Sequence, residues 1–324
     1  MKRPEFSASE GTSLAGAMLA VASAGGRTPT SPQVAVIDGL AALLLSVPQT
    51  AALMPVEPAD LAQSLTDSEQ RHMAAQLLVL VALVDERPDE RCAHAAERAC
   101  RALGVHPENL DLLHEVVQRR IHRSRHHMFR RFLIDGLRTG SLSGDVIALR
   151  DLVRERHDHP DIAAPYLALE SLPEDTFGNA FFQFYRNRGW RFPGEDGGLP
   201  TAYGFEVHDA CHLLSGYDTT PEDEINVVAF QAGATSRLPW LVLGVNLVTF
   251  NSGLAYGPTT LLHYAPHEGN LDPGEFIRAL DRGISVRRDL DADLDLHSVW
   301  QTPLDELREE LGIEGARDVR VPGH

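Results

Sequence analysis

Two histidines four residues apart are the residues of this chain whose types and spacing most directly suggest chemistry. They are His208 and His212, and Asp209 directly follows the first of them. On a helix the two imidazoles lie on one face, with Cβ atoms about 5–6 Å apart, which suits two ligands of one metal ion. A metalloprotease helix has this spacing, but the glutamate that would serve as its base is absent here. The segment therefore predicts a metal site whose ligands include both histidines.

A second helix, beginning a few residues later, can bring a carboxylate to the same place. Gly216 is expected to end the first helix, and Thr220 and Pro221 provide an N-cap followed by a proline at the first helical position. Glu224 then falls in the first turn, where the helix dipole favours negative charge. Together with Asp209, this gives two imidazoles and two carboxylates around one point. Such mixed nitrogen and oxygen ligation suits Zn²⁺, Fe²⁺ or Mn²⁺ and does not decide between them.

The spacing of these four residues is also the signature of a known family. His208, Asp209 and His212 are followed by eleven residues and then Glu224, an HDxxH-x11-E pattern. In this pattern the chain resembles the coenzyme Q (ubiquinone) biosynthesis protein Coq-four family. The similarity continues in three flanking stretches, which are residues 171–178, 206–207 and 307–313. The resemblance extends over roughly residues 135–313, so it bears on the C-terminal two thirds of the chain.

The resemblance implies an all-helical domain in which the four motif residues hold one divalent metal per chain. Zinc is the metal expected first, with iron and manganese as alternatives. The resemblance also implies that the substrate is a polyprenylated aromatic acid, whose ring carbon bearing the carboxyl group is oxidatively decarboxylated and hydroxylated at or near a membrane. The implied catalytic residues and metal ligands are the same four: His208, Asp209, His212 and Glu224.

A non-catalytic role stays open as an alternative. A scaffolding function for a quinone-biosynthesis complex has been proposed for the family, so the chain could be a lipid-binding scaffold with a structural metal. A metal without an open coordination position would favour that alternative. The chain also departs from the short family members, because they lack its N-terminal helical part and residues 251–273 look like an insertion. A different quinone or a related prenylated aromatic acid is therefore also open as the substrate.

Other residues near the motif are expected to have structural roles. Cys211 points away from the histidine face of its helix and is expected to pack as a small apolar residue. Asp218, Glu222 and Asp223 are expected to be cap and surface charges rather than ligands. The residues expected to line an apolar groove for the prenyl tail, unless they are plain core, are Phe181, Phe182, Leu241, Val245 and Leu247.

Helical spacing of apolar residues, together with capping signals, dominates the rest of the chain. Helices are expected over residues 33–53, 73–84, 90–103, 142–155, 174–186, 208–214, 221–231, 272–285 and 303–311, and over a stretch that begins near 106 and continues into 119–131. Signals for strands and hairpins are scarce. The sequence thus predicts an all-α protein of two helical units, the C-terminal one being the metal-binding domain.

Three parts are expected along the chain: a flexible segment over residues 1–28, a helical domain over 29–130 and the Coq-four-like metal-binding domain over 131–324. The middle part resembles TerB-like helical domains of the tellurite-resistance type. This resemblance is carried by the end of the apolar helix at residues 80–85, the acidic connection after it and the Ala-rich helix that leads to 102–105. In that family, acidic residues near such a turn are candidate metal ligands. The alternative is a solvated turn between two helices.

Composition restricts the partners and the compartment. The chain has 29 Lys and Arg against 46 Asp and Glu, a net charge of −17, which argues against nucleic acid as a partner. Its three cysteines show no CxxC spacing, which indicates a reducing compartment and a cytoplasmic protein. An uninterrupted apolar run of about 18 residues, which a spanning helix needs, is absent.

The Arg- and His-rich run at residues 119–131 is conspicuous in so acidic a chain. It also contains Ile121, Met128 and Phe129, so it could bind anionic lipid head groups or a phosphate, at the inner face of the cell membrane. The alternative is a solvated helix paired with acidic residues elsewhere. The partners expected are therefore a polyprenylated quinone precursor or prenyl lipid, a peripheral membrane surface, other quinone-biosynthesis proteins and a second copy of the chain, forming a homodimer.

Overall fold

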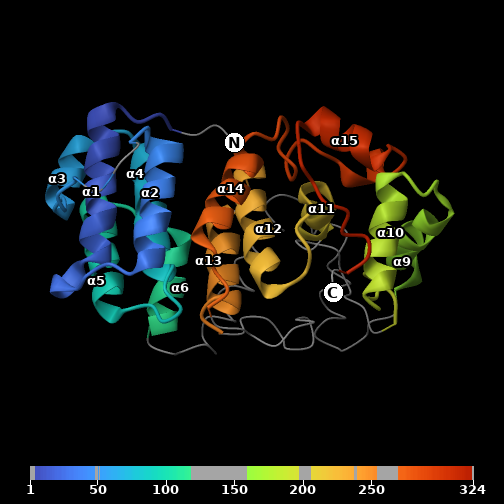
Figure 1. Cartoon of the computed structure of the whole chain (residues 1–324), viewed down its shortest axis with the longest axis horizontal. Helices are drawn as coiled ribbons and strands as arrows, with labels where there is room; N and C mark the ends of the chain where they lie inside the picture. The colour runs from blue at the N-terminus through green and yellow to red at the C-terminus, as the bar shows by residue number, and fades with distance from the viewer. Residues whose placement is uncertain are drawn as a thin grey trace. The chain divides into compact units, whose positions relative to one another are not determined.

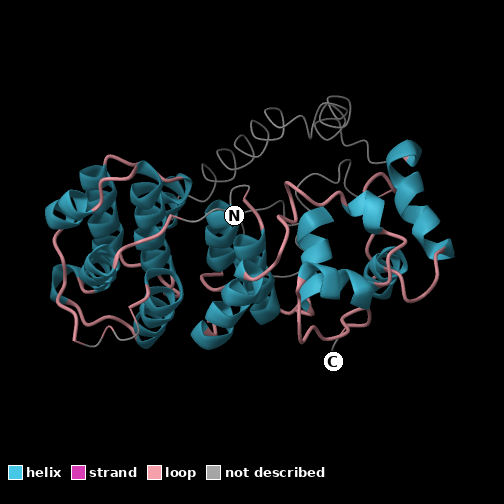
Figure 2. Ribbon diagram, turned by 90° about the horizontal axis from the view of Figure 1, so that it is seen from above, coloured by secondary structure: helices cyan, strands magenta, loops and turns pink. Residues whose placement is uncertain are grey.

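The computed structural model describes residues 4–47, 50, 52–117, 159–196, 206–236, 239–253 and 269–322. Within these ranges the chain is all-α, as the sequence predicts, and the β-type pairing found there is an isolated bridge between Thr176 and Pro303 (Figure 2). The α-helices are α1 (Ala8–Ala22), α2 (Ser31–Leu45), α3 (Pro58–Ser64), α4 (Ser68–Leu83), α5 (Glu90–Leu103), α6 (Glu108–Val117), α9 (Pro160–Leu167), α10 (Phe177–Asn187), α11 (Glu206–Ser215), α12 (Pro221–Ala234), α13 (Pro239–Phe250), α14 (Pro273–Ile284) and α15 (Leu304–Leu311). Short 3₁₀ turns cover Ala24–Gly26, Ala168–Ser171 and Leu296–Val299.

The chain divides into two compact units. Unit 1 comprises Met1–Arg125 and Leu238–Asp281, and unit 2 comprises His126–Arg237 and Arg282–His324. The predicted division into residues 29–130 and 131–324 is therefore wrong for the segment that contains α13 and most of α14. That segment packs with the N-terminal helices, although the chain reaches it only after the metal-site motif.

Helix α4 is the centre of unit 1. Asp67 caps it by accepting hydrogen bonds from the backbone N–H groups of Glu69 and Gln70, both at 2.9 Å. Every residue from Met73 to Leu83 is buried, because α1, α2, α5, α6 and α13 all contact this helix (Figure 1). A helix that is apolar on all sides is stable in water only when other helices cover every side of it.

The N-terminal segment is part of the same core. Ser7 and Glu10 form a capping box that starts α1, with the Ser7 backbone N–H donating to the Glu10 carboxylate at 2.7 Å. Leu14 and Met18 are fully buried, since α1 contacts α2, α3 and α4. The predicted flexible segment at residues 1–28 is therefore wrong. Its small residues serve close packing instead, because a Cβ at Gly16 would lie only 2.7 Å from a backbone oxygen of the segment before α3.

The acidic connection after α4 is anchored within unit 1. Asp85 is only 9% exposed and accepts hydrogen bonds from the Arg27 guanidinium at 3.2 Å and from the Thr30 hydroxyl. Arg27 also donates to the Sγ of Cys92 at 2.9 Å. The expectation of a solvated turn is wrong for Asp85. It is a buried anchor that joins the start of α2 to the end of α4.

Helix α13 belongs to the core of unit 1 because its sides are apolar and close-fitting. It contacts α4 and α6, where the absence of a side chain at Gly244 lets Leu112 approach. Just beyond its C-terminus, the Asn251 amide donates to the Val84 carbonyl at 2.7 Å, which joins this segment to the end of α4. Long-range packing of this kind leaves no local signal in a sequence.

Unit 2 is built around the aromatic helix α10, whose first turn is capped by the Thr176 hydroxyl. The ring of Tyr185 stacks on Phe192 from the following loop, with centroids 4.4 Å apart. Helix α10 contacts α11, and α11 contacts α12. At the end of α14, a Cβ at Gly283 would lie 1.9 Å from the Phe230 carbonyl oxygen, so glycine is required for α12 and the end of α14 to approach this closely.

One predicted helix ends much earlier in the structure than expected. Helix α2 ends at Leu45, well before the predicted residue 53, because Ser46 adopts the left-handed conformation with φ 57°. Helices α1, α3, α9 and α13 lie outside the ranges predicted as helical. The predicted helix at 142–155, the Arg- and His-rich run at 119–131 and most of the expected insertion at 251–273 lie outside the described residues.

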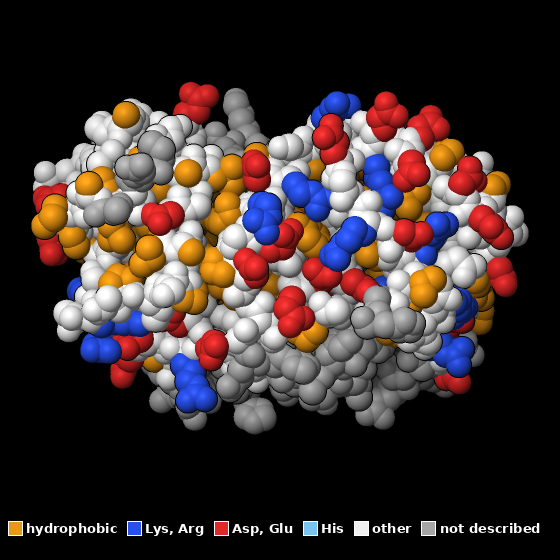
Figure 3. All heavy atoms as spheres, viewed as in Figure 1, with side chains coloured by type: hydrophobic (Ala, Val, Ile, Leu, Met, Phe, Trp, Pro, Cys, Tyr) orange, Lys and Arg blue, Asp and Glu red, His pale blue; other side chains and the backbone are white. Residues whose placement is uncertain are grey.

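The described part of the chain contains no helix that is both long and apolar enough to cross a membrane. On the face shown in Figure 3, acidic and basic side chains are interspersed over the region of α15. One such ion pair joins Arg288 to Glu310 at 3.1 Å. Opposite charges that alternate in this way leave that area without a patch of one sign.

Candidate metal site

Helices α11 and α12 contact each other and position the site, and the turn between them follows the predicted signals. Gly216 ends α11 with φ 76°, and a Cβ there would lie 2.2 Å from the backbone nitrogen of Arg317, so only glycine fits. The Thr220 hydroxyl caps α12 by accepting from the Asp223 backbone N–H at 3.3 Å. These signals place Glu224 in the first turn of α12, facing α11.

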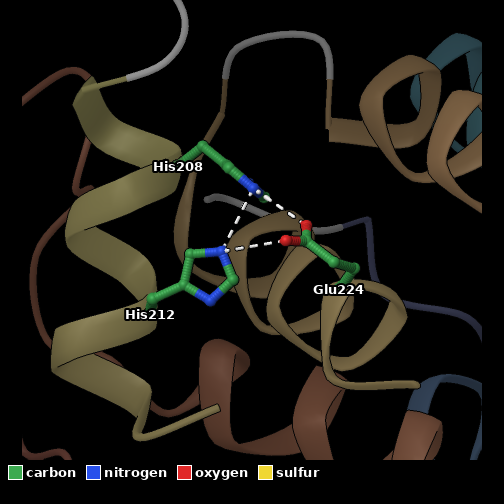
Figure 4. Close-up of side chains that lie close together, drawn as sticks. All are labelled: His208, His212 and Glu224. Carbon is green, nitrogen blue, oxygen red and sulfur yellow. Dashed lines mark hydrogen bonds and ion pairs between the residues drawn. The ribbon is translucent and has the colours of Figure 1, made fainter. Parts of the chain in front are cut away.

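Three of the four predicted ligands converge on one point (Figure 4). The Nε2 of His208 lies 3.3 Å from Oε2 of Glu224, and the Nε2 of His212 lies 3.7 Å from Oε1. The two Nε2 atoms are 3.3 Å apart. One ligand atom from each of the three residues lies within 4.8 Å of the others, a spacing at which a single ion can contact all three. The side chains of His212 and Glu224 are only 1% and 8% exposed, and that of His208 is 19% exposed.

The outer nitrogen of each imidazole has its own acceptor. Nδ1 of His212 lies 3.0 Å from the backbone carbonyl oxygen of Tyr217, and Nδ1 of His208 lies 3.2 Å from Oε1 of Gln231. An acceptor at Nδ1 places the ring proton there and leaves the Nε2 lone pair free for a metal. Because both Nε2 atoms face the Glu224 carboxylate, the chemistry of the donor set fits a divalent transition metal.

Without a metal, the same geometry separates the pKa values of the two histidines. Burial alone would lower the pKa of His208, but its hydrogen bond to the Glu224 carboxylate outweighs burial and raises the pKa to about 9. Burial lowers the pKa of His212 to about 4. Burial would raise the pKa of Glu224, but the two neighbouring histidines lower it. The metal-free site therefore holds one proton at neutral pH, between His208 and the carboxylate.

Asp209, the fourth predicted ligand, does not join the cluster. Its Oδ2 accepts a hydrogen bond from the hydroxyl of Tyr185 on α10. The expected set of four ligands is therefore three in this structure, because the residue after His208 is rotated by about 100° around the helix axis, toward α10. Burial raises the pKa of Asp209 to about 6, and burial beside this carboxylate raises the pKa of Tyr185 well above its ordinary value.

The predictions for the neighbouring residues hold in part. Cys211 is fully buried, as expected, and burial raises the pKa of its thiol. Glu222 is exposed, and Asp223 accepts from the Asp218 backbone N–H at 3.0 Å, as a turn residue does. Asp218 is not a surface charge, since it is 9% exposed and forms an ion pair with Arg188.

The residues predicted to line a prenyl groove belong to two different units. Phe181 and Phe182 are buried in unit 2, whereas Leu241 and Leu247 are buried in unit 1. Val245 is partly exposed on α13. The four buried residues therefore act as core of their own units, which is the plainer of the two roles that their types allow.

Two side chains next to the site were missed by the sequence analysis. Gln231 follows Glu224 by seven residues, which is two helical turns on the same face of α12, so its position could have been found from the motif. Tyr185 comes from α10, and its partnership with Asp209 has no sequence signal because the two helices meet only in the folded unit.

Neither a protein-family model nor a curated protein matches this chain. The resemblance to the Coq-four family therefore rests on the residues and their spacing.

Proposed function

We propose that this chain is a metal-dependent enzyme that removes the carboxyl group from the ring of a polyprenylated aromatic acid, a ubiquinone precursor, and introduces a hydroxyl there. The observation that carries the proposal is the convergence of His208, His212 and Glu224, with ligand atoms within 4.8 Å of one another, in the HDxxH-x11-E spacing. Two histidines and one carboxylate form the ligand set of both catalytic zinc sites and non-haem iron oxygenases.

The protein residues would hold the ion and define its charge. A bound divalent metal would supply Lewis-acid polarisation and orientation of the substrate carboxylate. Tyr217 and Gln231 fix the imidazole rings, Glu224 neutralises one positive charge, and Asp209 places a second carboxylate beside the cluster. The burial of His212 and Glu224 limits the access of water, which strengthens every charge interaction at the site.

The identity of the metal determines whether the oxidation occurs at the metal site or elsewhere. Zinc is the first expectation from the resemblance, but Zn²⁺ has no redox chemistry, so with zinc an oxidant would have to act elsewhere on the oriented ring. Iron or manganese would allow the oxidation to occur at the site itself, with an external oxidant such as dioxygen accepting the electrons and supplying the hydroxyl oxygen. Elemental analysis of the purified full-length chain therefore comes first, and we expect about one divalent transition metal per chain.

The variants His208→Ala and Glu224→Gln should lose most of the bound metal, because each removes one of three ligands. The matched control is Glu222→Gln, which neutralises an exposed carboxylate in the same first turn of α12 and should keep the metal. Unchanged metal content in both site variants would refute the site. Loss of activity toward a prenylated aromatic acid, measured as carbon dioxide release, should parallel the loss of metal.

A structural metal in a lipid-binding scaffold is the second candidate, and the near-complete burial of His212 and Glu224 favours it. Such a metal would lack an exchangeable ligand. Water exchange at a Mn²⁺-loaded site, measured by proton relaxation, distinguishes the two, because an enzyme needs an open position.

Association with a membrane is a further part of the proposal. It is tested by sedimentation with anionic vesicles, where charge reversal within residues 119–131 should weaken binding.

A further inference from the structure

We propose that Tyr185 is a positioning residue that keeps Asp209 off the metal, so that the ion has three protein ligands and an open position beside the Asp209 carboxylate. This inference rests on the metal site proposed above. It assigns different roles to the two carboxylates of the motif. Glu224 is a ligand, and Asp209 lies outside the coordination sphere.

The position of the Tyr185 hydroxyl is fixed by the packing of its ring. The ring stacks on Phe192 with centroids 4.4 Å apart and planes 17° apart, and it contacts Phe181 at 5.2 Å and the edge of Trp190 at 5.8 Å. Tyr185 is only 6% exposed. A hydroxyl held by a ring that is packed on several sides cannot follow a carboxylate that moves toward the metal.

Asp209 is close enough to the cluster for this restraint to matter. It follows His208 by one residue and precedes His212 by three, so its side chain is at the edge of the face that carries both histidines. Its negative charge acts on His208. Short aspartate side chains at such a position can turn toward a cation, and the hydrogen bond from Tyr185 to Oδ2 opposes that turn.

The Glu224 carboxylate is arranged differently. Its Oε2 and Oε1 atoms face the Nε2 atoms of His208 and His212, at 3.3 and 3.7 Å. Oδ2 of Asp209 instead accepts a hydrogen bond from the Tyr185 hydroxyl, which the low local dielectric of this buried region strengthens. The structure thus favours Glu224 as the carboxylate ligand and Asp209 as the carboxylate that faces whatever fills the open position.

The test is a double-variant cycle on the full-length chain with Tyr185→Phe, Asp209→Asn and the pair combined. Zinc affinity is measured by competition with a chromophoric chelator, and coordination is followed by the visible absorption of the Co²⁺-loaded protein. Asp209→Asn should bind zinc within about threefold of the unchanged protein, since no ligand is lost. Tyr185→Phe should bind zinc about tenfold more tightly and change the Co²⁺ spectrum, because the freed carboxylate becomes a fourth ligand; tenfold is the lower end of outer hydrogen-bond effects on metal affinity. The double variant should return to the affinity and spectrum of the unchanged protein.

The control is Tyr166→Phe, which removes a hydroxyl from the same aromatic cluster and should leave affinity and spectrum unchanged. Loss of zinc by Asp209→Asn as severe as that of Glu224→Gln would make Asp209 a ligand and overturn the inference. An unchanged affinity and spectrum in a folded Tyr185→Phe, or weaker binding there, would also overturn it. If Tyr185→Phe does not fold, Asp209→Asn alone decides. An unchanged chain that binds no transition metal would instead refute the proposed function.

Discussion

Metal binding at this site should release one proton per ion at neutral pH, and the proton should come from His208. In the metal-free site the Glu224 carboxylate raises the pKa of His208 to about 9, so its Nε2 carries a proton where the ion must bind. Burial lowers the pKa of His212 to about 4, so that ring is already neutral at pH 7. Glu224 is ionised, since its pKa is lowered. The protein should therefore be titrated with metal at several pH values.

The magnitude follows from these values. A group with a pKa of about 9 is about 99% protonated at pH 7, so nearly one full proton leaves for each ion bound. The apparent affinity should then rise about tenfold per pH unit between about pH 6 and pH 9, or about a hundredfold from pH 6 to pH 8. Above about pH 9 it should level off, and below about pH 4 the slope should approach two protons as His212 becomes charged.

Calorimetric titration in two buffers of the same pH but different ionisation enthalpies measures the number of protons released. Titration of a chelator of known proton release, in the same buffers, is the control. A value near zero at pH 7, or an affinity that is flat from pH 6 to pH 8, would refute the reasoning, because it would mean that His208 is neutral in the metal-free site. Two protons at pH 7 would mean that His212 is charged as well.

Three further changes test the surroundings of the site and the packing of the units. Gln231→Leu should weaken zinc binding by about 10- to 100-fold in chelator competition, because Nδ1 of His208 loses its acceptor, whereas Gln231→Glu should stay close to the unchanged protein. Asn109→Leu should raise the free energy of unfolding in urea by about 1–3 kcal/mol, since within the described part of the chain neither polar atom of this buried amide has a hydrogen-bond partner; a lower midpoint would contradict this. Gly283→Ala should lower the free energy of unfolding by about 1–3 kcal/mol, because the new Cβ meets the Phe230 carbonyl at 1.9 Å; unchanged stability would show that α14 can move without cost.

The sequence alone predicted the parts of this protein that depend on neighbours along the chain. The cap at Thr220 and the helix end at Gly216 are a local hydrogen bond and a local backbone conformation, so residue types reveal them. The same holds for the shared face of His208 and His212, because helix geometry fixes which residues lie together. Spacing within two adjoining helices was thus enough to predict the three residues that could hold a metal ion.

What only the tertiary structure decided are the contacts between segments far apart in sequence. Residues 1–28 were predicted to be a flexible segment, yet they contain helix α1, whose small residues allow it to pack closely in unit 1. Helix α13 follows the metal-site motif in sequence but completes the core around α4. Asp209 belongs to the motif by spacing, but its carboxylate accepts a hydrogen bond from Tyr185 on another helix. The periodicity of a sequence determines which residues share a helix face. Which other helix packs against that face depends on shape and on burial across the whole fold.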